Sequence, residues 1–190
     1  MAAERIILGV DPGTQITGHG VIRLRQGAPA ELLDAGVIRL AGGDEHPRKL
    51  SIILAELTTL IEQHLPDELA IEAPFYGRNL QSMLKLGRVQ GVVMAAAMAR
   101  DIPVAEYAPS KVKKAVTGNG RASKHQVGQL CRQHLPQLQE QAALPAADAT
   151  DALAVALCHA FQQGAAAGGT GRRYADWKAF VHANRGRTSD

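Results

Sequence analysis

The stretch ILGVDPGTQITGHGVI, residues 7–22, decides the fold, because it ends an apolar run with a single acid and then turns sharply. Residues 5–10 are predicted to form a buried strand, since they make a short and largely apolar run. Asp11 follows at the end of that strand, and Pro12 and Gly13 begin a glycine-rich turn. The sequence therefore predicts a carboxylate that a rigid strand holds at the edge of a sheet.

The rest of the chain predicts a mixed architecture. Two strands follow the turn and are joined by a short connection, which favours antiparallel pairing. Further along, strands alternate with helices, which implies parallel pairing through crossover connections. The fold class is therefore expected to be α/β, a mixed sheet of an antiparallel meander plus parallel strands, with helices on both faces. The predicted strands are residues 5–10, 20–24, 32–40, 68–73 and 102–107, and the predicted helices follow Pro47, span about residues 80–100, follow Pro109, follow Ser123 as N-cap and span about residues 145–163.

One compact domain is expected, because 190 residues match the common size of a domain. Hydrophobic residues make up 46% of the chain and charged residues 21%, so a core can form and disorder is not indicated. We assign residues 1–163 to this domain. Residues 164–190, which begin with GAAAGGTG, are expected to be a flexible C-terminal tail.

Charge and cysteine content narrow the class of protein. The net charge of +3 is too small to establish a nucleic-acid partner, but residues 108–139 contain Lys and Arg and no Asp or Glu, so this segment is locally positive. Cys131 and Cys158 lack the spacing of a zinc site or a disulfide framework, which favours a reducing compartment. The N-terminal MAAERIILGV matches neither a signal peptide nor a membrane span, so we expect a soluble, cytoplasmic protein without membrane contact.

The helix predicted over residues 80–100 has an unusual row of small residues. Gly87, Gly91 and Ala95 recur every four residues and form a seam where another backbone can approach closely. Two interpretations stay open. The seam packs inside its own domain, or it meets a partner subunit.

Four acids converge in the predicted fold. Asp11 and Glu72 both end strands, and parallel neighbours place them at the sheet edge where α/β proteins bind ligands. Each acid alone could be a turn or rim residue. However, Asp148 and Asp151 lie three apart in PAADATDALAVALCHAF, so they share the helix face that continues through apolar residues. Carboxylates that converge in this way repel one another unless a cation lies among them.

The ligand set selects the cation. All four candidate ligands are carboxylate oxygens, which favour Mg²⁺ or Mn²⁺ over zinc. Two such ions form the clamp used for in-line phosphodiester displacement. We therefore predict two Mg²⁺ ions, with Mn²⁺ as a substitute. Glu106 also ends a strand and is a rival ligand, but with Asp148 and Asp151 available we expect it to be structural.

The sequence resembles the RuvC family of Holliday-junction resolvases, which have an RNase H-like fold. The resemblance implies a homodimeric, Mg²⁺-dependent endodeoxyribonuclease of recombination and DNA repair. Such an enzyme nicks a four-way DNA junction in symmetric pairs and leaves 5′-phosphates. It makes Asp11, Glu72, Asp148 and Asp151 the catalytic, metal-binding acids. The resemblance covers about residues 6–161 and rests on five ordered stretches, ILGVDPGTQITGHGVI, LAIEAPFYGRN, SMLKLGRVQGVV, VAEYAPSKVKKAVTGNGRASKHQV and PAADATDALAVALCHA.

The resemblance also implies DNA contacts. Phe75 occupies the place of a family aromatic that stacks near the junction crossover. Lys113 and Lys124 match family lysines that contact phosphate, and Arg78 and Arg121 are further candidates. Branch-migration proteins are a candidate further partner. The chain departs from the family in two places, with Ala73 where Gln is frequent and a tail without clear counterpart.

Three rival functions are considered. VDPGT resembles the phosphate-binding turn of actin-like ATPases and sugar kinases, but a chain of this length lacks the second domain of that superfamily. A related RNase H-like nuclease acting on RNA would share the acids but would not be expected to match the Phe75 loop or the lysine run. A non-enzymatic junction binder fits only if the acids are cap and rim residues.

Overall fold

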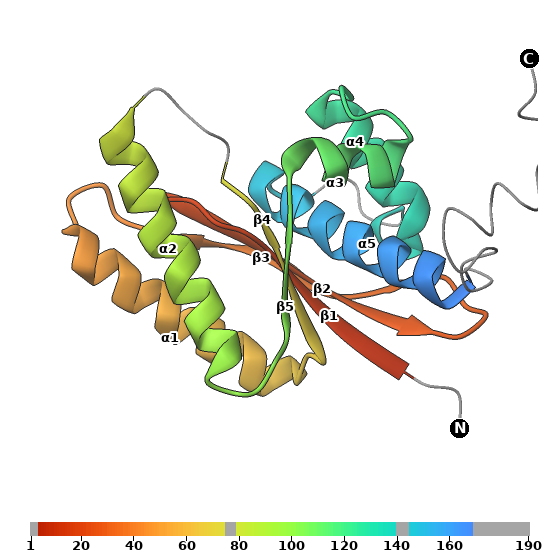
Figure 1. Ribbon diagram of the computed structural model, residues 1–190, viewed down its shortest axis with the longest axis horizontal. Coiled ribbons are helices and arrows are strands. Elements are labelled where there is room, and N and C mark those ends of the chain that lie inside the picture. Colours follow the sequence, from red (N-terminus) through yellow and green to blue (C-terminus); the bar gives the residue numbers. More distant parts are fainter. Residues whose placement is uncertain (1–3, 75–78, 140–144, 169–190) are drawn as a thin grey trace, which may run out of the picture.

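A computed structural model describes residues 4–74, 79–139 and 145–168, and its centre is a five-stranded sheet (Figure 1). The strand order is β3-β2-β1-β4-β5. The pairs β1/β2 and β2/β3 are antiparallel, whereas β4 and β5 run parallel to β1. The predicted meander with parallel strands added is therefore confirmed. The strands are β1 Glu4–Asp11, β2 Ile16–Arg25, β3 Glu31–Arg39, β4 Glu68–Glu72 and β5 Val104–Tyr107.

Helices cover both faces of the sheet, as predicted (Figure 1). One face carries α1 and α2, and the other carries α3, α4 and α5, with α5 lying along β1 and β2. None of the helices that the structure describes is long and apolar enough to cross a membrane. The helices are α1 His46–His64, α2 Leu80–Met98, α3 Pro109–Thr117, α4 Lys124–His134 and α5 Ala147–Gly168, with a 3-10 turn η1 at Pro136–Leu138.

The unbroken apolar run of β1 follows from this layering. Successive side chains of a strand point to opposite faces. Ile7 accordingly packs into the core beneath α5, and Leu8 and Val10 pack into the core beneath α1 and α2. All three side chains are fully buried, so β1 is the rigid centre of the sheet.

Helix starts agree closely with the sequence. Ser123 caps α4 as predicted, because its hydroxyl accepts a hydrogen bond from the Gln126 backbone N–H while the Gln126 side chain accepts one from the Ser123 backbone N–H. Pro47 and Pro109 lie in the first turns of α1 and α3, where proline is tolerated.

Two predicted boundaries are wrong. β2 begins at Ile16 and not at residue 20, because Gly18, which was assigned to the turn, belongs to the strand. The reason is tertiary: a Cβ on Gly18 would lie 2.0 Å from the carbonyl oxygen of Asp148, so only glycine lets α5 approach. At the other end, α5 continues to Gly168, past the predicted end at Gln163. The remainder of the predicted tail lies outside the described residues.

The small-residue seam of α2 does not pack inside the domain. Val89 and Val93 on one side of the helix are fully buried against the sheet. On the other side, no described residue lies within 4 Å of a Cβ added to Gly87 or Gly91. Among the described residues the within-domain interpretation is therefore wrong, and the partner interpretation stays a prediction.

Candidate active site

Asp11 and Glu72 end neighbouring parallel strands. The register pairs Val10 of β1 with Ile71 of β4, so the following acids project from the same sheet edge. The two carboxyl groups interact, because Glu72 acts to raise the pKa of Asp11 and Asp11 acts in turn on the pKa of Glu72.

The electrostatics of Asp11 show that the predicted acids act on one another. Burial, together with the negative charges of Glu72, Asp151 and Asp148, raises the pKa of Asp11 from 3.8 to about 8. Burial also raises the pKa of Glu72, with a contribution from the charge of Asp151. All four acids are therefore close enough to interact electrostatically at this edge of the sheet.

Backbone contact brings α5 to this edge. Asp148 lies in the first turn of α5, and its carbonyl oxygen lies over Gly18. A Cβ on Gly9 would lie 2.2 Å from the carbonyl oxygen of Ala152, one turn further along the helix. Because the glycines of β1 and β2 have no side chains, α5 packs directly against the backbones of these strands. This close approach brings Asp148 and Asp151 towards Asp11.

Lysines line the same cavity as the acids. Nζ of Lys124 donates a hydrogen bond to Oδ2 of Asp151 at 2.6 Å, and this bond raises the pKa of the ammonium group. Lys113 is a second cation at the cavity wall, and its charge and that of Lys124 act to lower the pKa of Glu72. The cavity has a volume of about 290 Å³ and is lined by Asp11, Glu72, Asp151, Lys113 and Lys124 among others.

The carboxylate oxygens of these acids are suitable ligands for a divalent cation, although the side chains are not arranged as a coordination site. Within residues 4–74, 79–139 and 145–168, no three His, Cys, Asp or Glu side chains are grouped as a metal site. Asp151 pairs with Lys124 instead, and the pKa of Asp11, raised to about 8, favours the protonated carboxyl group at neutral pH. A hard cation could neutralise these carboxylates in place of the ammonium group and the proton. Metal binding by these acids stays a prediction.

The raised pKa of Asp11 predicts how stability depends on pH. The folded pKa of about 8 lies above the unfolded 3.8, so the folded state retains a proton that the unfolded chain releases. Stability of the metal-free protein therefore falls as pH rises from about 4 to about 8. Because Asn does not titrate, Asp11→Asn should melt roughly 4–8 °C above wild type at pH 8.5 in chelator, or about 2 kcal/mol. Melting curves that stay parallel from pH 5 to pH 8.5 would contradict this.

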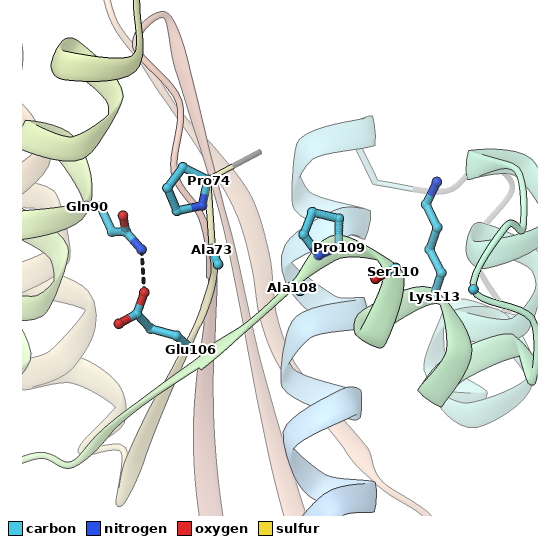
Figure 2. Close-up of a pocket in the computed structure, with 9 residues that line it drawn as sticks. Ala73, Pro74, Gln90, Glu106, Ala108, Pro109, Ser110 and Lys113 are labelled. Atoms are coloured by element: carbon cyan, nitrogen blue, oxygen red, sulfur yellow. Dashed lines mark hydrogen bonds between the residues drawn. The ribbon is translucent and has the colours of Figure 1, made fainter. Parts of the chain in front are cut away.

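The other predicted residues lie in different places. Arg121 is exposed in the loop between α3 and α4, where its backbone N–H donates to Oδ1 of Asn119. Phe75 and Arg78 lie outside the described residues. Glu106 does not line the cavity of the acids, and it accepts a hydrogen bond from Gln90 instead (Figure 2). Its exclusion from the site stays a prediction that this contact supports.

A buried polar network on α5 was not foreseen. A hydrogen bond of 2.6 Å joins the Tyr107 hydroxyl and Nδ1 of His159, and Nε2 of His159 is hydrogen-bonded to a carboxylate oxygen of Glu68. Arg5 donates to the other oxygen of Glu68. The network ties α5 to three strands and so holds the helix that carries two of the acids. Its signal in the sequence was His159, a polar residue on the inward face of an apolar helix.

The chain is similar to known nucleases over most of its length. Residues 7–159 match the family model described as crossover junction endodeoxyribonuclease RuvC. The protein of that name from Porphyromonas gingivalis is 52% identical over 182 residues, with 95% of each chain covered. The one from Salinibacter ruber is 48% identical over 185 residues, which are 97% of this chain and 99% of that protein.

A solved structure extends the similarity to the fold. The RuvC of T. thermophilus in complex with a Holliday junction substrate superposes with a TM-score of 0.76 at 31% identity, covering 84% of this chain and 94% of that chain. This likeness confirms the predicted RNase H-like fold.

Proposed function

The chain belongs to the crossover junction endodeoxyribonuclease RuvC family, and from this premise we propose that it resolves four-way DNA junctions in recombination and repair. It nicks two strands symmetrically by metal-dependent phosphodiester hydrolysis and leaves 5′-phosphate ends. The observation that supports the proposal is the electrostatic coupling of four acids from β1, β4 and α5, beside two lysines, at one edge of the sheet.

Each acid has a definite part in this proposal. Asp11, Glu72, Asp148 and Asp151 supply oxygen ligands for two Mg²⁺ ions, for which Mn²⁺ can substitute. When bound, the ions supply activation of the attacking water and stabilisation of the leaving oxygen. Because β1 and β4 are each paired on both sides, Asp11 and Glu72 are held without backbone freedom.

The lysines bind the substrate's phosphates. Lys113 and Lys124 line the cavity, where their ammonium groups can contact the phosphate to be cut. Lys124 neutralises Asp151 in the free protein. If Asp151 held a cation, Lys124 would lose this partner and could contact DNA instead. Phe75, Arg78 and Arg121 stay predicted DNA contacts.

A cleavage assay tests the proposed function. A synthetic four-way junction with Mg²⁺ should be nicked symmetrically on two strands, and a chelator should reduce the rate by at least roughly 10³-fold. Linear duplex DNA and RNA of the same sequences serve as controls. Equal cutting of either control would favour a general RNase H-like nuclease, and junction binding without cutting would favour the non-enzymatic binder.

We further propose that two chains associate through α2. Of the large hydrophobic side chains that are exposed in the described part of the chain, three lie on this helix: Leu80, Leu84 and Met98. Gly87 and Gly91 lie between them with open space above. The α2 helix of a second chain could therefore pack closely against this apolar face. The resulting dimer would contain two active sites, as paired cuts require.

Replacing Gly91 with Leu tests the dimer. A Leu side chain at the seam would hold the two helices apart and cost about 1–3 kcal/mol, which is roughly ten- to hundred-fold in the dimer dissociation constant. The monomer should keep its fold, because nothing lies within 4 Å of an added Cβ. Sedimentation should show monomers for Gly91→Leu and dimers for Gly43→Leu, a control in equally open space. An unchanged dimer in Gly91→Leu would contradict the proposal.

A cytoplasmic location also belongs to the proposal. Cys131 and Cys158 are free and buried, and burial raises the pKa of their thiols to about 12 and about 11. Buried, protonated thiols suit a reducing compartment. Partnership with branch-migration proteins stays a prediction.

A further inference from the structure

The helix α5 meets β1 and β2 through glycines at the end of the sheet that carries the acids. Gly9 is paired with Gly20 across the two strands, and Gly18 is paired with Asp11. A Cβ added to Gly9, Gly18 or Gly20 would lie 2.2, 2.0 or 2.6 Å from an atom of α5. Packed elements are held in place by side chains that interdigitate, and glycine supplies none. This contact therefore sets how closely α5 approaches the strands, but not where the helix lies along them.

The hydrogen bonds of His159 give α5 a fixed position along the sheet. This residue is only 3% exposed, and both nitrogens of its ring have a partner. Nδ1 is joined to the Tyr107 hydroxyl at 2.6 Å, and Nε2 is joined to a carboxylate oxygen of Glu68. Arg5 donates to the other oxygen of that carboxylate and holds it in place. Hydrogen bonds are directional, and a buried one is costly to break, so a helix that slides along the strands loses both bonds.

Both partners of His159 lead to β4, the strand that ends in Glu72. Glu68 is the first residue of this strand. Tyr107 lies on β5, where the sheet register pairs it with Glu72. The carbonyl oxygen of Tyr107 also accepts a hydrogen bond of 2.9 Å from the backbone N–H of Ala73, directly after the acid. His159 therefore ties α5 to the start of β4 directly and to the acidic end of β4 through Tyr107.

We propose, resting on the function proposed above, that His159 is a positioning residue for the divalent cation. Its bond to Tyr107 fixes α5 relative to Glu72, and so sets the distance between the acid of β4 and the two acids of α5. Neither ring nitrogen of His159 bonds one of these acids, so the residue acts through the helix alone. The bond to Tyr107 has the larger effect on the cation, because it is made at the acidic end of β4, whereas the bond to Glu68 is made at the other end.

The experiment measures Mn²⁺ binding to the full chain by isothermal titration calorimetry, without DNA. Tyr107→Phe removes only the hydroxyl and should weaken Mn²⁺ binding roughly ten-fold. His159→Gln places a polar group near the position of Nε2 and so keeps only the bond to Glu68, and it should show the same loss. His159→Asn places a polar group near the position of Nδ1 and so keeps the bond to Tyr107, and its affinity should stay near that of wild type. Single-turnover cleavage should follow the same order, and junction binding in chelator should not change. Val93→Ala, which truncates a fully buried side chain in the core beneath α1 and α2, is the control for lost stability and should leave Mn²⁺ affinity unchanged.

The other outcomes separate this inference from the proposed function. A Tyr107→Phe variant that melts at a lower temperature but binds Mn²⁺ as wild type does would overturn the inference and leave the nuclease function intact. Equal losses of Mn²⁺ affinity in His159→Asn and His159→Gln would also overturn it, by assigning His159 to general packing of the core. Should the His159 variants fail to fold, Tyr107→Phe compared with Val93→Ala decides the question. A wild-type protein that binds no Mn²⁺ and cuts no junction would remove the proposed function and the inference with it.

Discussion

Replacing Asp148 with Asn should reduce the rate of junction cleavage on the order of 10³-fold and leave junction binding unchanged. Asn has nearly the same shape, but it removes a negative charge that acts on Asp11 and one of the proposed ligands of the cation. The substitution should not move α5, because the helix meets Gly18 through the carbonyl oxygen of Asp148 and not through its side chain. The expected result is therefore a defect in chemistry alone.

Single-turnover cleavage and binding by fluorescence anisotropy measure these two effects separately. Asp101→Asn is the matched control, because Asp101 lies in the turn after α2 with φ of 57°, a conformation that Asn also adopts. Full activity of Asp148→Asn would show that Asp148 is only a helix-capping residue and would remove it from the site.

Replacing Gly18 with Ala should destabilise the protein and weaken cleavage together. The added Cβ would lie 2.0 Å from the carbonyl oxygen of Asp148 and 3.0 Å from the backbone nitrogen of Ala149. Both are backbone atoms, so the helix or the strand has to shift. Such overpacking costs about 1–3 kcal/mol. A shift of about 1 Å in the helix that carries two of the acids should slow cleavage about 10²-fold.

Thermal melting and single-turnover rates of the same sample test this expectation. Gly43→Ala is the control, since nothing lies within 4 Å of its added Cβ and its stability should change little. A Gly18→Ala variant with wild-type stability and wild-type cleavage would show that the close contact between α5 and β2 does not position the acids.

The central sheet and the four acids could be predicted because their signals are local. Asp11 and Glu72 directly follow apolar runs, and Asp148 and Asp151 share a helix face with apolar residues, so periodicity and the expected parallel pairing of strands predicted that they meet. The electrostatic effect of all three other acids on Asp11 agrees with that placement. Their role as metal ligands was predicted from repulsion and is still to be measured.

The start of β2 could not be predicted because its cause is a tertiary contact. Gly18 looks like a turn residue in the sequence, and glycine usually weakens a strand. The need for glycine at this position is evident only from its contact with α5, which follows over a hundred residues later. Local propensity gave the wrong boundary because the packing of a distant helix overrides it.

The contacts of the charged side chains could not be predicted from the sequence either. Lys124 was expected to contact phosphate, and in the free protein it binds Asp151. The network of Tyr107, His159 and Glu68 joins two strands and a helix, so no spacing in the sequence reveals it. In contrast, the seam of α2 was recognised from the spacing of its small residues, and its exposure agrees with the partner interpretation, which stays a prediction.

The most direct test is a crystal soaked in Mn²⁺ at a concentration that supports junction cleavage, with the ions located by anomalous scattering. Two ions should appear between the carboxylates of β1, β4 and α5, with the ammonium group of Lys124 withdrawn from Asp151. If cleavage proceeds at that concentration and no ion lies within coordination distance of Asp11, the account of this site as a metal-dependent nuclease centre is wrong.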